Sequence, residues 1–178
     1  MDILLIDPPH IILKNVPTDR GYNVGPASLA AYLRQHGLEA ALITGDLLTD
    51  CKPKSTLSSL VSEWKTTVRD LARGQRLIAA AVADDGHPVW RKLEAIIRKH
   101  EPLAVGISYL TPLKPIVEKV AAIVKGVNPD IKVIVGSFHP TLCPDDVMAN
   151  ASMDFAVIGE GEVPLLALMR EIRKPEPD

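Results

Sequence analysis

Short apolar runs alternate with amphipathic segments along most of this chain. Runs rich in Val, Ile and Leu that end in small or polar residues predict strands buried on both faces of a parallel sheet. The segments between them carry apolar residues at helical spacing, as expected for the crossovers that parallel strands require. Strands are predicted over residues 3–7, 39–44, 103–108, 131–136 and 154–158. The pattern predicts a doubly wound α/β fold.

The helical segments complete this pattern. Leu29, Ala30 and Leu33 give one face to a helix over residues 25–36, which Gly37 ends. Further helices are predicted over residues 112–126, 144–150 and 163–173. Right-handed crossovers then favour a flavodoxin-like, five-stranded sheet of order 2-1-3-4-5. We expect one domain over residues 1–173, followed by a linker or frayed tail over 174–178, where two prolines prevent a helix.

Residues 47–86 interrupt the alternation and are too long for a plain connection, so we expect a helical insertion there. Gly74 is predicted to separate its first helix from an Ala-rich piece over residues 75–83. The apolar stripe of the first helix could pack on the domain's own sheet or offer a surface to another domain. It consists of Leu57, Leu60, Val61, Trp64, Val68 and Leu71.

Composition excludes several classes of protein. With 178 residues, 47% of them apolar, the chain can bury a sizeable core. The net charge is −2 and the basic residues do not gather on one predicted face, which argues against nucleic acid as a partner. No apolar run reaches the length of a membrane span, and the N-terminus enters a strand rather than a signal sequence. Two cysteines are too few for a disulfide framework. Together, these observations lead us to expect a cytoplasmic protein.

The third and fourth predicted strands both end in small and hydroxyl residues. Ser108-Tyr109-Leu110-Thr111 follows one of them, and Gly136-Ser137-Phe138-His139 follows the other. Neighbouring parallel strands bring their carboxyl ends to the edge where open α/β sheets bind ligands. Short hydroxyls can hydrogen-bond a ligand's polar edge there, and glycine lets the backbone come close to it. Such a floor suits a large flat ligand better than a phosphate.

Ser108-x-Leu110 with Gly136-Ser137 resembles the SxL and GG elements of cobalamin-binding domains. Residues 4–9, 25–33, 136–141 and 159–162 extend the likeness to the cobalamin-binding domain of cobalamin-dependent radical S-adenosylmethionine enzymes. This resemblance covers residues 1–46 and 87–172. It implies that cobalamin is the cofactor and that its nucleotide tail enters a slot beside the third and fourth strand ends. Ser137 departs from the usual second glycine.

Two further segments belong to the implied site. The segment Tyr22-Asn23-Val24-Gly25-Pro26 opens the first helix at the same sheet edge, so it could lie over the upper or side face of the corrin ring or form a flexible turn. The amides of Gly159-Glu160-Gly161 are expected to bond polar groups of the ligand. His139 could bond the tail or pack within its loop. The candidate cofactor contacts are Pro8, Pro9, Tyr22, Asn23, Ser108, Tyr109, Leu110, Thr111, Gly136, Ser137, Phe138, His139, Gly159, Glu160 and Gly161.

The lower axial ligand of cobalt is the point at which the chain departs most from classical cobalamin domains. Those domains carry DxHxxG after the first strand, and the histidine coordinates cobalt. Here Asp7-Pro8-Pro9-His10 displaces the histidine by one residue and the glycine is missing. His87 has the right local spacing after Asp85, but it precedes a helix that starts with Pro88, which favours a capping role. The radical enzymes use no protein histidine, which fits this chain better; His10 stays a candidate ligand.

The chain has no CxxxCxxC, the motif that holds the iron-sulfur cluster of radical S-adenosylmethionine enzymes. S-adenosylmethionine and the cluster are therefore expected in a partner protein or in a following catalytic domain. Two alternatives share the fold. A phosphoacceptor signalling domain needs an acidic pair after the first strand, an Asp after the third and a Lys after the fifth. This chain has Asp7 alone, Ser108 and Gly159 at these places, which disfavours that alternative. A nucleotide or flavin module is also disfavoured, because it needs a glycine-rich phosphate loop after the first strand and this sequence has none there.

Overall fold

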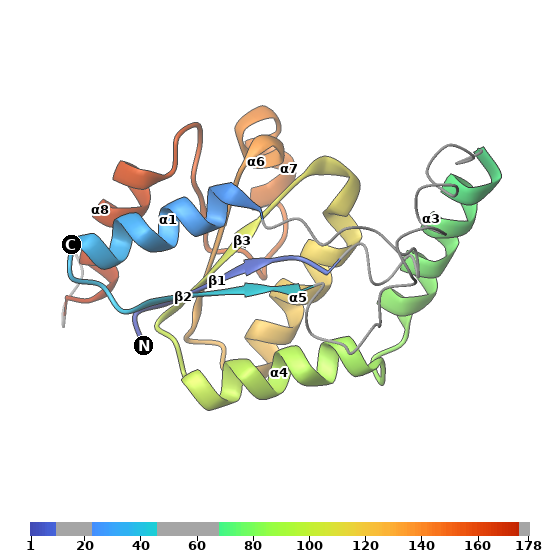
Figure 1. Cartoon of the computed structure of the whole chain (residues 1–178), viewed down its shortest axis with the longest axis horizontal. Helices are drawn as coiled ribbons and strands as arrows, with labels where there is room; N and C mark the ends of the chain where they lie inside the picture. Colours follow the sequence, from blue (N-terminus) through green and yellow to red (C-terminus); the bar gives the residue numbers. More distant parts are fainter. Residues whose placement is uncertain (10–22, 46–67, 175–178) are drawn as a thin grey trace, which may run out of the picture.

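The computed structural model describes residues 1–9, 23–45 and 68–174, and it places helices on both faces of a central sheet (Figure 1). Within these ranges the sheet has five parallel strands in the order β2-β1-β3-β4-β5. The predicted doubly wound, flavodoxin-like fold and its strand order are confirmed. The strands are β1 (Ile3–Asp7), β2 (Ala40–Thr44), β3 (Ala104–Ser108), β4 (Lys132–Gly136) and β5 (Phe155–Ala156).

The strand bounds follow the apolar runs closely except at one edge. β1 has its predicted bounds, and β2, β3 and β4 each begin one residue later than predicted. β5 is shorter than predicted, although pairing continues on either side of it. The Asp154 amide donates to the Val133 carbonyl at 2.9 Å, and the Val157 amide donates to the Val135 carbonyl at 2.8 Å. The edge segment thus aligns the loop that follows it with the end of β4.

The helices form one layer on each face of the sheet. α1 (Val24–Gln35) and α8 (Glu162–Ile172) cover one face, whereas α3 (Val68–Ala83), α4 (Pro88–His100) and α5 (Lys114–Val127) cover the other. Short turns η3 (Thr111–Leu113), α6 (Phe138–Leu142) and α7 (Pro144–Met148) join them at the carboxyl edge. Among the described residues, no helix is both long and apolar enough to cross a membrane.

Alternation along the strands divides the buried side chains between two cores. In β1, Leu4 and Ile6 join the core under α4 and α5, while Ile3 and Leu5 join the core under α1 and α8. Successive side chains of a strand point to opposite faces, so this division follows from the backbone alone. Every residue of β1 is buried, as expected for a strand covered on both sides.

The described part of the expected insertion packs on this same domain. α3 runs without interruption from Val68 to Ala83, so the predicted break at Gly74 is wrong. One interior glycine costs a helix about 1 kcal/mol, which packing readily offsets. Ile78 lies in the α4–α5 core, and the Trp90 indole donates to the Ala81 carbonyl at 2.7 Å. The stripe from Leu57 to Trp64 lies outside the described residues.

Candidate functional site

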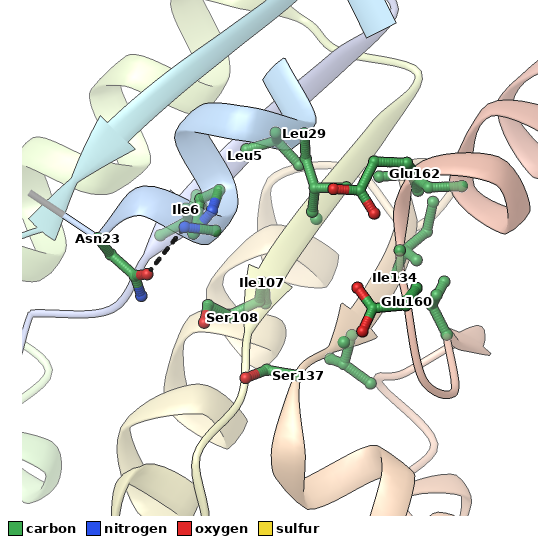
Figure 2. A pocket seen from close by; sticks show the side chains of 18 of the residues that line it. Leu5, Ile6, Asn23, Leu29, Ile107, Ser108, Ile134, Ser137, Glu160 and Glu162 are labelled. Atoms are coloured by element: carbon green, nitrogen blue, oxygen red, sulfur yellow. Dashed lines mark hydrogen bonds between the residues drawn. The ribbon is translucent and has the colours of Figure 1, made fainter. Parts of the chain in front are cut away.

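A cleft with a cavity of about 200 Å³ opens at the carboxyl edge of the sheet. Figure 2 shows it between the first turn of α1 and the start of α8. Its lining comes from the ends of β1, β3 and β4, the start of α1, and the loop that joins β5 to α8. It therefore lies at the edge that the sequence predicts for a ligand.

Two glycines on neighbouring strands leave room for the cleft. Gly106 and Gly136 lie in β3 and β4, on the face of the sheet that α1 and α8 cover. A Cβ atom on Gly106 would lie 2.6 Å from Leu5 Cδ2, whereas one on Gly136 would meet nothing closer than Val157 at 3.8 Å. The Leu5 side chain therefore fills the space over Gly106 and closes the inner end of the cleft. The space over Gly136 stays empty and opens toward solvent.

The structure brings about half of the predicted contacts together at the cleft. Those lining the cleft are Asn23, Ser108, Gly136, Ser137, Gly159, Glu160 and Gly161. Pro8 and Pro9 are buried, and the Pro9 backbone lies where a Cβ on Gly45 would fall. Leu110 and Phe138 are exposed and do not line the cleft. Tyr22 and His10 lie outside the described residues.

Sequence reasoning missed the apolar walls of the cleft. They include Leu5, Leu29, Gly106, Ile134, Val157 and Leu165. An isolated glycine within a strand often marks a close backbone approach, so Gly106 carried a usable signal. The leucines and the valine carried no such signal. An apolar residue that borders the cleft has the same sequence pattern as one that is fully inside the core.

His139 belongs to a polar cluster behind the cleft. Its Nε2 atom lies 3.0 Å from Asp146 Oδ2, and its Nδ1 atom lies 3.0 Å from Thr111 Oγ1. Since a carboxylate only accepts, Nε2 carries the proton in the bond to Asp146, and Nδ1 shares its hydrogen bond with the Thr111 hydroxyl. The ring also packs on Tyr109 with centroids 4.4 Å apart. Both ring nitrogens thus have protein partners, a geometry that matches the alternative of packing within the loop.

Asp146 links this cluster to the start of α5. Lys114 Nζ lies 2.6 Å from its carboxylate, and together Lys114 and His139 hold the pKa of Asp146 below its usual value. The pair is partly exposed, so its electrostatic contribution to stability is small. Its role is geometric, because it joins the segment after β4 to the helix after β3.

Ser137 has a backbone conformation that side chains rarely adopt. Its φ is 94° and its ψ is −156°, in a region occupied almost only by glycine. Such a conformation costs about 1–3 kcal/mol and persists where neighbouring contacts enforce it. Here the Thr141 hydroxyl donates to the Ser137 carbonyl at 2.8 Å and accepts from the Gly159 amide at 3.0 Å. These two bonds clamp the turn after β4 to the loop after β5.

The same clamp affects the predicted amide contacts of the 159–161 loop. The Gly159 amide already donates to the Thr141 hydroxyl, whereas the amides of Glu160 and Gly161 have no hydrogen-bond partner among the described residues. A Cβ on Gly161 would lie 3.0 Å from Leu29 Cδ2, so the loop lies close against α1. The loop therefore forms a wall of the cleft.

The start of α1 is fixed to the end of β1. The Asn23 side chain accepts from the Gly25 amide at 3.3 Å and caps the helix, as Figure 2 shows. Its amide group donates to the buried Asp7 carboxylate at 3.2 Å. Asn23 thereby sets the position of one wall of the cleft.

The described histidines near this edge do not form a metal site. Within the described ranges, no group of three or more His, Cys, Asp or Glu side chains could hold a metal ion. His87 caps α4, since its Nδ1 accepts from the Val89 amide at 3.3 Å. The predicted capping role is confirmed.

The family model of the B12 binding domain matches residues 10–169. The chain belongs to the B12-binding domain family. Cobalamin is therefore its cofactor, as the sequence resemblance implied. No curated protein and no solved structure gives a match. Within this B12-binding domain, the cleft occupies the edge of the sheet to which the SxL and GG-like elements contribute Ser108, Gly136 and Ser137.

We predict that Ser137→Gly stabilises the cofactor-free domain by about 1 kcal/mol. Relief of the backbone strain exceeds the entropy that an added glycine gives to the unfolded chain. Urea unfolding at equilibrium measures the change, and Ser137→Ala is the matched control because alanine keeps the strain. A Ser137→Gly domain no more stable than Ser137→Ala would contradict the strain assigned to this turn.

Proposed function

We propose that this domain binds cobalamin with the nucleotide tail in the cleft between α1 and α8, and presents the cofactor for methyl transfer in a radical S-adenosylmethionine system. The observation that carries the proposal is the open layer at Gly136, directly beside Ser108 and above the closed layer at Gly106. The domain binds, orients and shields the cofactor rather than acting as a catalyst alone.

The residues of the cleft fit a flat heteroaromatic base. Ile134, Leu29 and Leu165 offer apolar contact to the faces of such a ring, and Ser108 offers a hydroxyl at the open end. A cavity of about 200 Å³ is somewhat larger than the roughly 150 Å³ that accommodates benzene, so it suits one base and not a macrocycle. The corrin ring would remain outside, over the carboxyl edge.

When bound, cobalamin supplies the cobalt centre that carries the methyl group. We propose that no side chain of this domain coordinates the cobalt. His87 is used as a helix cap and His139 is held by Thr111 and Asp146, which supports this assignment. A separate catalytic domain or protein would supply the substrate, S-adenosylmethionine and the iron-sulfur cluster, because the chain has no CxxxCxxC.

Two surface features support such a partner and its compartment. Phe138 and Leu142 are 71% and 72% exposed on α6, which begins directly after the cleft residue Ser137, and a covering partner would bury them. Cys143 is a free, exposed thiol, which favours a reducing compartment. We therefore place the system in the cytoplasm.

We predict that Gly136→Leu weakens cobalamin binding by at least about tenfold while the domain stays folded. The added Cβ meets only ordinary contacts, but the rest of the leucine side chain fills the space assigned to the tail. Titration with hydroxocobalamin, followed by absorbance after gel filtration, measures the affinity and the expected single equivalent. Gly126→Leu is the matched control, since nothing lies within 4 Å of a Cβ there. Equal affinity in both variants would place the tail elsewhere.

We predict that Ser108→Ala weakens binding by roughly 1 kcal/mol, or about fivefold in Kd, through the loss of one neutral hydrogen bond. The same titration measures it. Ser28→Ala, on the exposed side of α1, should leave the affinity unchanged. An affinity of Ser108→Ala equal to that of the native domain would mean that the Ser108 hydroxyl does not contact the ligand.

We predict that His10→Ala and His87→Ala each leave the spectrum of bound cobalamin unchanged. Electron paramagnetic resonance of the cobalt(II) form should show no nitrogen hyperfine splitting from an axial base, because neither side chain is assigned to the metal. His87→Ala should still cost about 1 kcal/mol in stability by removing the cap of α4. Splitting that is present in the native domain and vanishes in His10→Ala would make His10 the ligand, with Asp7 orienting it.

A further inference from the structure

Two serine hydroxyls face the cleft. Ser108 is the register partner of Gly136, and Ser137 is the next residue along the chain. Both are half-buried, and Figure 2 shows their side chains close to one another at the mouth of the cleft. Neither hydroxyl bonds to any residue that the structure describes. Each therefore has its hydrogen-bonding capacity free for a ligand.

The fold gains nothing from a serine at position 137. The residue sits at the N-cap of α6, a place where serine usually caps, yet its side chain makes no cap bond. Its contribution to the clamp with Thr141 is its carbonyl, which glycine would supply equally. Its φ of 94° favours glycine as well. A strained residue with an unused polar group at a ligand site indicates a role toward the ligand.

A second kind of polar group also lines the cleft. The side chains of Glu160 and Glu162 line it from the start of α8, and Figure 2 shows their carboxylates directed into it. Neither carboxylate has a partner among the described residues. The mouth thus combines two hydroxyls, which donate or accept, with two groups that only accept.

This set of groups distinguishes between the bases that a B12 cofactor can carry. Dimethylbenzimidazole linked to ribose has one free ring nitrogen, which a single hydroxyl satisfies, and its outer edge carries methyl groups. Adenine has additional ring nitrogens that accept and an exocyclic amine that donates. Beside dimethylbenzimidazole, the second hydroxyl and a carboxylate would give up their hydrogen bonds to water and gain none from the ligand. Beside adenine, the hydroxyl would donate to a ring nitrogen and the carboxylate would accept from the exocyclic amine.

We propose that Ser137 is a specificity-determining residue of the cleft, which selects a cobamide with an adenine base over one with dimethylbenzimidazole. This inference rests on the proposed function, because it requires the nucleotide tail to occupy the cleft. Cobalamin itself still binds, with Ser108 on its free ring nitrogen. The selection comes from the pairing of Ser137 and the adjacent carboxylates with the purine edge.

The test compares three cofactors on three proteins. Cobalamin, its adenine analogue and cobinamide, which has no nucleotide tail, are titrated into the native domain, Ser137→Gly and Ser137→Ala. The native domain should bind the adenine cobamide about fivefold more tightly than cobalamin, as expected for one additional hydrogen bond. Both variants should lose that preference. Ser137→Ala keeps the backbone strain, so it separates the hydroxyl from the strain that Ser137→Gly also removes.

The outcomes separate the two proposals. If cobinamide binds as tightly as cobalamin, or nothing binds to a folded domain, the tail does not use the cleft and the proposed function fails. If the tail strengthens binding but the ratio of the two affinities is the same in all three proteins, the specificity inference alone is overturned. A native preference for cobalamin would overturn it as well.

Discussion

The contact between Leu5 and the bare backbone of Gly106 sets the depth of the cleft. These two residues are register partners in β1 and β3, and the leucine side chain lies where any Cβ at position 106 would go. It closes the layer beneath the cleft and forms its apolar floor. One layer higher, Gly136 again has no side chain, but no leucine reaches across it. The cavity is thus the space over Gly136 that no side chain fills, next to Gly106, where Leu5 fills the corresponding space.

Polar bonds hold the rim of this space in place. Thr141 joins the turn after β4 to the loop after β5, and His139 joins the same turn to Thr111 and Asp146. Three loops that follow three different strands are therefore joined by side-chain hydrogen bonds. A rim held in this way loses less conformational entropy when a ligand binds, which favours affinity without adding contacts.

Much of the fold was predictable from the sequence because buried parallel strands leave continuous apolar runs. The helix through Gly74 was not, since tertiary packing outweighs the propensity of one glycine. α6 was missed because Pro140 lies within it, although its first turn tolerates a proline. At the site, the hydroxyl residues after β3 and β4 were found from their position, but Leu5, Leu29 and Leu165 were not. Their exposure to the cleft depends on how α1 and α8 are set apart over the sheet, and local sequence does not encode that separation.

The two layers of the molecule are unequal, and this has a consequence for how the domain behaves without its cofactor. The core beneath α4 and α5 is continuous and also includes α3, whereas the core beneath α1 and α8 is smaller and borders the cleft. Local opening, as measured by amide hydrogen exchange, is therefore expected to begin in α1 and α8. A bound tail would complete that smaller core and slow exchange there while leaving α4 and α5 almost unaffected. Cofactor loading would then appear as the tightening of one layer of a domain whose other layer is already formed.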